Sequence, residues 1–125
     1  FSLSENTAYA CEPFVTTEQG GGFVRNGKIK NIFAINSRKK TKNEEADKLL
    51  NFIWENFNML PFALRWITKE WEEKEARDLL DILIKKKAVQ AYPVLIEVNE
   101  QRVAQAEHTF IPMESGVTVT TKALA

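Results

Sequence analysis

The chain has 125 residues, of which 44% are hydrophobic and 27% are charged, so we expect one globular domain and not a disordered segment. Its 17 basic and 17 acidic residues balance, which gives no support to a role on nucleic acid or on a membrane surface. No run approaches the roughly 20 apolar residues that span a bilayer. The single cysteine, Cys11, excludes an internal disulfide and fits a reducing, cytoplasmic compartment. The chain opens with Phe1 and not Met, so we expect a processed, trimmed or partial polypeptide.

The first forty residues have the composition of β-strands. Residues 7–15 are rich in small, aromatic and β-branched side chains, which predicts a first strand. The glycines at 20–22 can take positive φ freely and predict a turn over residues 16–22. Asn26-Gly27 is a strong hairpin signal through the type I′ turn that it permits. We therefore expect a hairpin between residues 23–25 and 28–35.

The middle of the chain has helical periodicity. One continuous apolar face predicts a first helix, with its members at helical spacing: Ala46, Leu49, Leu50, Ile53, Trp54 and Phe57. Thr41 followed by Glu44 resembles a capping box at its start. A second, short helix is expected to begin at Pro61, and a third covers residues 72–86, with an acidic start and a basic end. Strands are then expected at 94–98, 102–111 and 116–121.

Three helices followed by a β-hairpin are also the outline of a winged helix, which gives DNA binding as a rival function. The third helix is acidic over its first half, the end that usually enters the major groove. Phosphates would repel that end, and the lysines at 39–42 and 85–87 are most simply solvated charges. Nucleic acid is therefore not an expected partner.

Two glutamates stand in stretches that otherwise have the character of strands. Glu12 lies in the first predicted strand and Glu107 in the strand predicted over 102–111. A carboxylate buried in such a strand must be paired, protonated or bound to a cation, because burying it alone is too costly. Strand alternation places Glu107 on one face with Gln105 and Thr109, and places His108 on the other. The plainer alternative is a pair of edge strands whose carboxylates are solvated.

Four short motifs, in order along the chain, resemble the type 2 methionine aminopeptidases of archaea and eukaryotes. They are Glu12-Pro-Phe14, Leu60-Pro-Phe-Ala-Leu-Arg-Trp66, Ala91-Tyr-Pro-Val-Leu95 and Ala104-Gln-Ala-Glu-His-Thr109. The resemblance implies an α+β chain, the C-terminal part of a pita-bread fold with a winged-helix-like helical insertion. It divides the chain into catalytic-domain strands at 1–39, the helical insertion at 40–88 and further catalytic-domain strands at 89–125.

The resemblance also implies a site for two divalent metal ions, Co, Mn, Fe or Zn. Glu12 would bind one metal and act as the catalytic acid/base, and Glu107 would bridge both metals. Tyr92, Ile32 (or Phe33) and Pro61 match or lie near positions that line the substrate site in the family. The activity implied is removal of the initiator methionine from nascent proteins. The alternative is a non-enzymatic pita-bread relative that acts as a protein- or nucleic-acid-binding module.

The family's other metal ligands, two aspartates and a histidine, fall upstream of the Glu12 motif. His108 is not expected to replace them, because strand alternation directs it away from Glu107. We therefore expect a partner, the N-terminal half of the same enzyme, as a separate or cleaved chain. The strands carrying Glu12 and Glu107 would otherwise have unpaired edges.

Overall fold

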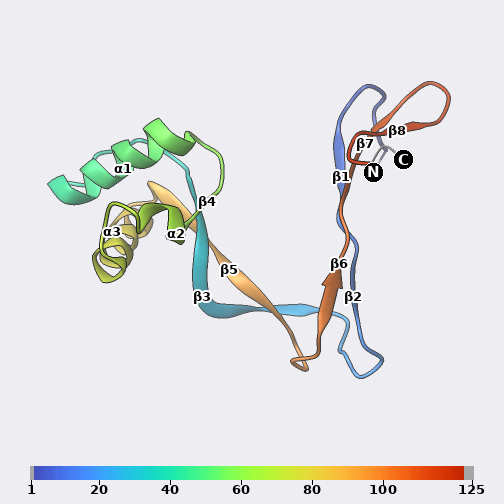
Figure 1. Ribbon diagram of the computed structural model, residues 1–125, viewed down its shortest axis with the longest axis horizontal. Coiled ribbons are helices and arrows are strands. Elements are labelled where there is room, and N and C mark those ends of the chain that lie inside the picture. The colour runs from blue at the N-terminus through green and yellow to red at the C-terminus, as the bar shows by residue number, and fades with distance from the viewer. Residues whose placement is uncertain (1, 123–125) are drawn as a thin grey trace. The chain divides into compact units, whose positions relative to one another are not determined.

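The structure is a computed structural model and describes residues 2–122 (Figure 1). The chain forms two compact units, one made of Asn26–Leu95 and the other of the segments up to Arg25 and from Ile96 onward. We call them the helical unit and the strand unit. In the described part of the chain, no helix combines the length and apolar composition that a membrane crossing needs.

The helical unit packs three helices, α1 (Glu44–Phe57), α2 (Leu64–Ile67) and α3 (Glu73–Lys85), with a three-stranded sheet. The sheet has the order β4-β3-β5 and contains β4 (Phe62–Ala63) and parts of β3 (Val24–Ile35) and β5 (Val89–Glu97). Figure 1 shows the helices gathered at one end of β3 and β5. The expected apolar face of α1 is confirmed by burial of Ala46, Leu49, Leu50 and Ile53, and α3 buries Ala76, Leu79, Leu80 and Leu83 at the same spacing.

Aromatic rings complete this core. Phe57 at the end of α1 stacks on Phe62 of β4, with 5.4 Å between ring centroids. Phe62 in turn stacks on Phe33 of β3 at 5.8 Å, and both are almost fully buried. These ring contacts therefore connect α1 to the sheet through β4, although β4 has only two residues.

The strand unit consists of two separate ladders. One sheet has the order β1-β7-β8, formed by β1 (Tyr9–Cys11), β7 (His108–Pro112) and β8 (Val117–Val119). The other pairs β2 (Phe14–Thr16) with β6 (Val103–Gln105). The strands expected at 7–15 and 102–111 are thus each divided in two, and both divisions fall next to the glutamates of interest.

The hairpin expected at Asn26-Gly27 is wrong, because β3 runs through both residues without interruption. A type I′ turn needs positive φ at both central residues, and neither Asn26 nor Gly27 has it. β3 is hydrogen-bonded to β5 in the sheet, and pairing of this kind favours an extended chain over a local turn. Positive φ occurs earlier instead, at Gly22 (φ 75°), at the end of the turn that was expected over 16–22.

Two expected helix starts are also wrong. Asn43, and not Thr41, caps α1: its side-chain oxygen accepts the N–H of Ala46 at 2.9 Å. Thr41 is buried and donates from both its backbone N–H and its hydroxyl to Asp47. The second helix does not start at Pro61 but at Leu64, since burial of Phe62 in the core and pairing with β3 make Phe62–Ala63 a strand.

Strand β5 begins at Val89, earlier than expected, and includes Tyr92 and Pro93. Proline cannot donate a ladder hydrogen bond and is confined to the edges of sheets. β5 is an edge strand in the order β4-β3-β5, so Pro93 is tolerated within it.

Candidate metal centre

Glu12 and Glu107 lie opposite each other in a break between two ladders of identical register. In one ladder Cys11 pairs with His108, and in the other Phe14 pairs with Gln105. Continuing either ladder across the break places Glu12 opposite Glu107 and Pro13 opposite Ala106. A hydrogen bond of 3.2 Å from the Ala106 N–H to the Pro13 carbonyl fits this alignment.

Proline explains why the ladder breaks at this point. Pro13 can accept a hydrogen bond from Ala106 but has no N–H to return, so one of the two bonds of that pair is lost. Pairs alternate along an antiparallel ladder, so the Glu12–Glu107 pair is of the non-hydrogen-bonded kind, in which side chains stand closest. The expectation that both glutamates lie within strands is therefore corrected: each follows or precedes a strand end, and the ladder geometry still brings them together.

The two carboxylates form an electrostatically unfavourable pair in the absence of a counter-charge. Like charges directly opposite each other across a ladder are destabilising, and neither glutamate has an ion pair with another described residue. Both side chains are exposed, so they do not form the buried carboxylates that the strand pattern suggested. The one hydrogen bond to Glu12 comes from the Gln105 amide, whose Nε2 donates to Oε2 at 3.1 Å.

This donor set fits a hard divalent cation, but only in part. Carboxylate oxygens suit Mg, Mn and related ions, and Zn and Fe also accept them. Two carboxylates on one side of a ladder can hold such an ion between them. Within residues 2–122, however, no group of three or more histidine, cysteine, aspartate or glutamate side chains is gathered as a metal site. The pair therefore supplies one side of a coordination shell.

His108 has a different set of contacts. Its Nδ1 lies 3.0 Å from the Thr121 hydroxyl, which also accepts the N–H of Thr109 at 2.9 Å. In register His108 stands opposite Cys11, one pair away from the glutamates. Neighbouring pairs in a ladder project to opposite faces, so His108 and Glu107 are placed on different sides.

The residues expected to line a substrate site belong to the helical unit. Ile32 pairs with Ala63 and is 41% exposed, while Phe33 beside it is buried in the core, so only Ile32 offers an apolar surface. Pro61 is exposed immediately before β4. Tyr92 is 43% exposed, and its hydroxyl accepts the Gln90 amide. The structure thus places Ile32 within β3 and Pro61 immediately before its partner strand β4, with Tyr92 on β5.

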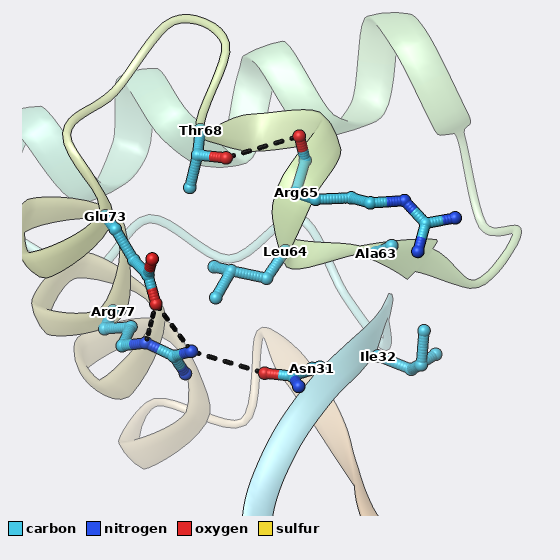
Figure 2. A pocket seen from close by; sticks show the side chains of 8 residues that line it. All are labelled: Asn31, Ile32, Ala63, Leu64, Arg65, Thr68, Glu73 and Arg77. Carbon is cyan, nitrogen blue, oxygen red and sulfur yellow. Dashed lines mark hydrogen bonds and ion pairs between the residues drawn. The ribbon is translucent and has the colours of Figure 1, made fainter.

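A pocket of about 280 Å³ lies next to Ile32 (Figure 2). Arg77 of α3 crosses its wall: the guanidinium pairs with Glu73 at 2.8 Å and donates to the Asn31 side chain at 3.3 Å. Figure 2 shows Arg65 extending away from this cluster. Arg77 was not among the predicted site residues, although its spacing of four residues from Glu73 on a helix is a recognisable signal.

Glu97 is a second residue that was not predicted from the sequence. Only 3% of it is exposed, and its two oxygens accept backbone N–H groups from Gly21, Asn99 and Gln101. Burial acts to raise the pKa of Glu97, but these backbone hydrogen bonds outweigh it, so the pKa lies below its ordinary value. Through these hydrogen bonds, Glu97 connects the turn that contains Gly21 to the turn that follows β5. Gly21 is required there, because a Cβ would collide with the Val98 side chain.

Curated proteins resemble this chain in sequence over nearly its whole length, although no family model matches the chain. It is 38% identical over 98% of its length to a methionine aminopeptidase of Saccharolobus solfataricus, and 40% identical over 90% of its length to one of Methanocaldococcus jannaschii. These matches cover 40% and 37% of the two relatives, at their C-terminal ends, so the chain spans about 40% of the length of the curated proteins it matches.

A solved structure described as a thermophilic Arx1 is also similar, with a TM-score of 0.76 over 90% of this chain and 29% of that chain. The sequence identity is 18%, so this likeness shows the fold alone. The likeness indicates that this chain, which is mixed α/β, has the fold of part of a pita-bread protein.

Proposed function

This chain belongs to the methionine aminopeptidase family, as the C-terminal part of its members, and we propose that it supplies two carboxylates to an enzyme that removes N-terminal methionine from nascent proteins. The observation that carries the proposal is the register that sets Glu12 opposite Glu107. Two carboxylates in that arrangement repel each other unless a cation lies between them.

The relatives imply a divalent metal cofactor. We propose two ions, drawn from Co, Mn, Fe or Zn, with Glu12 holding one and Glu107 placed to bridge both. When bound, such ions lower the pKa of a coordinated water and polarise a carbonyl. Glu12 would take the proton released by the attacking water and return it to the leaving amine. The exposure of its side chain allows this role, because a reacting group must be reachable by substrate.

The helical unit would contribute to substrate recognition. Ile32 and Pro61 offer apolar surface at the β3–β4 pairing, as a methionine side chain requires, and Tyr92 adds a ring with a polar end. We keep the proposal that residues 40–88 form a winged-helix-like insertion and that 1–39 and 89–125 belong to the catalytic domain. The expected substrates are peptides that begin with Met followed by a small residue.

The remaining metal ligands, two aspartates and a histidine, would come from polypeptide outside residues 1–125, either as a separate or cleaved chain or in the same one. The strand unit supports this need for a partner. Phe14, Val15 and Val103 are 58%, 64% and 43% exposed on the β2–β6 ladder, which has an unpaired edge on either side in the described structure. Exposed apolar strands of this kind require a cover. Such an enzyme would act in the cytoplasm, where nascent chains emerge.

A non-enzymatic member of the fold, acting as a binding module, is the alternative. It would have no reason to keep two carboxylates opposed across a ladder, since they destabilise the strands that carry them. The pair therefore favours the enzyme.

The test is an activity measurement on the assembled enzyme that contains this chain. We expect release of methionine from the peptide Met-Gly-Met after loading with Co²⁺, Mn²⁺, Fe²⁺ or Zn²⁺, and no release after treatment with a chelator. Absence of methionine release with all four metals would overturn the proposal. Mass spectrometry of the same denatured sample identifies which polypeptide carries the remaining ligands.

A further inference from the structure

We infer that Gln105 is a positioning residue, which holds the Glu12 carboxylate in the orientation that metal binding needs; this inference rests on the function proposed above. Its basis is one contact: Gln105 Nε2 donates to Glu12 Oε2 at 3.1 Å. Among the described residues, no other side chain or backbone group forms a hydrogen bond with Glu12.

The ladder geometry makes this contact a specific one. Gln105 stands opposite Phe14, two residues along the strand direction from Glu12, so the two side chains are diagonal neighbours on one face. Gln105 is also two residues before Glu107 on its own strand, and strand alternation places that pair on one face. Glu12, Gln105 and Glu107 therefore form a group of three polar side chains on the same side of the broken ladder.

The chemistry of the amide suits the task better than that of a charged donor. A lysine or arginine at this position would bind Glu12 more strongly but would repel two divalent cations. A glutamine amide donates a hydrogen bond without charge at any pH, and it occupies only one of the two carboxylate oxygens. Oε1 of Glu12 is left free for a cation.

Glu12 needs such a restraint because it is exposed and lies beside the ladder break. A long exposed side chain samples many rotamers, and each one lost on metal binding carries an entropic cost. A hydrogen bond formed in advance removes part of that cost. Groups that orient metal ligands in this manner change metal affinity or activity by about 10–100-fold when they are removed.

The test compares Gln105→Met with Gln19→Met in the assembled enzyme. Methionine matches glutamine in length but has no donor, and Gln105 is exposed, so the change should not disturb folding. Gln19 is an exposed glutamine of the same unit whose side chain has no hydrogen bond among the described residues, which makes it a matched control. Binding of Mn²⁺ is measured by titration calorimetry, and kcat and KM are measured with the methionine peptide.

We expect Gln105→Met to weaken Mn²⁺ at one of its sites by about 10–100-fold and to lower kcat by a similar factor, with KM for the peptide unchanged. The control should match the unaltered enzyme. The double variant Glu12→Gln with Gln105→Met should bind Mn²⁺ no more weakly than Glu12→Gln alone, because the glutamine acts only through the carboxylate.

Three results would overturn the inference. Mn²⁺ binding by Gln105→Met that stays within twofold of the unaltered enzyme removes the positioning role, while the function proposed above survives. Additive losses in the double variant assign Gln105 an effect independent of Glu12. An unaltered enzyme that neither binds Mn²⁺ nor releases methionine sinks the proposed function, and the inference falls with it.

Discussion

The helical unit and the strand unit are stabilised in different ways. Every buried apolar residue of the described chain lies in the helical unit, where helices α1 and α3 and the sheet enclose a single core. In the described part of the strand unit the one buried residue is Glu97, and large side chains such as Phe14, Val15 and Phe23 are more than half exposed. The strand unit is therefore organised by ladder hydrogen bonds and turns, with no apolar core of its own.

The difference shows where stability and where chemistry reside in this chain. A core buried within residues 26–95 can hold the helices together without outside help. The opposed carboxylates occur in the other unit, where Phe14, Val15 and Val103 are exposed. The part of the chain with the candidate metal ligands is thus also the part most in need of further polypeptide. Substitutions in the two units should accordingly have different effects.

The largest effect is expected from Glu107→Gln in the assembled enzyme. The change keeps the side chain's shape but removes one of the charges that offsets the metal ions. Such electrostatic stabilisation is worth several kcal/mol, so kcat/KM for methionine release should fall by more than about 1,000-fold. Bound metal, measured by elemental analysis, should fall with it. Glu114→Gln, at an exposed glutamate of the same unit, serves as the control; unchanged metal content in Glu107→Gln would contradict the assignment.

In the helical unit, Leu83→Ala should cost about 2–5 kcal/mol of unfolding free energy, because it leaves a cavity in the core. Leu83 on α3 is fully buried. Urea unfolding followed by helical circular dichroism measures the loss. Val103→Ala in the strand unit removes a side chain that is 43% exposed and should cost less than about 1 kcal/mol in the same experiment. Equal losses would show that the two units share one core.

Phe14→Ser tests whether the strand unit is covered by other polypeptide. In the chain of residues 1–125 alone, the helical unfolding transition should not move, since Phe14 lies outside the core. In the assembled enzyme, loss of a buried aromatic contact should cost about 1–3 kcal/mol and lower the melting temperature. Differential scanning calorimetry on both samples makes the comparison. An assembled enzyme whose melting temperature is unchanged would show that nothing covers this face.

A smaller effect is expected at the start of α1. Asn43→Ala removes the side chain that caps the Ala46 N–H and should cost about 1 kcal/mol. Asn51→Ala is the matched control, because Asn51 lies exposed within the same helix and alanine is the better helix former. In thermal unfolding, Asn43→Ala should therefore lower the melting temperature, and Asn51→Ala should raise it slightly. A control that loses as much as Asn43→Ala would exclude the capping interaction as the cause.

The smallest effect on stability should come from protonation of Glu97, and it should be confined to the two turns that Glu97 connects. Its pKa in the folded chain is below the usual 4.5, so the stabilisation it gives is complete above that value and is lost as the pH falls through the lowered pKa. Amide hydrogen exchange at Gly21 and Asn99 should then accelerate. Glu97→Gln has one acceptor oxygen instead of two, so either the Gly21 or the Asn99 amide loses its acceptor. That amide should exchange faster at neutral pH, and neither amide should keep this pH dependence. Slow exchange of both amides in the variant would contradict the role of Glu97.

Resemblance in four short motifs correctly gave the family, which the archaeal relatives confirm. Periodicity predicted the buried faces of α1 and α3, and the bounds of α3 to within one residue, because a helix depends on contacts three and four positions apart. Predictions made from neighbouring residues were wrong where contacts between distant segments determine the secondary structure. Asn26-Gly27 has the composition of a turn and lies in a continuous strand, and Phe62 follows a helix-start signal and is drawn into a strand by burial.

Glu12 and Glu107 are recognisable as unusual from the amino-acid sequence, because carboxylates are rare in strands of that composition. Three features are visible only in the folded chain: the two glutamates stand opposite each other, Gln105 donates a hydrogen bond to Glu12, and the ladder breaks at Pro13. The same holds for Glu97, whose partners at Gly21 and Asn99 come from two different turns. The cause is the range of the interactions: helix contacts are encoded within one turn of chain, whereas strand register joins segments more than eighty residues apart, as in the pairing of Thr16 with Val103.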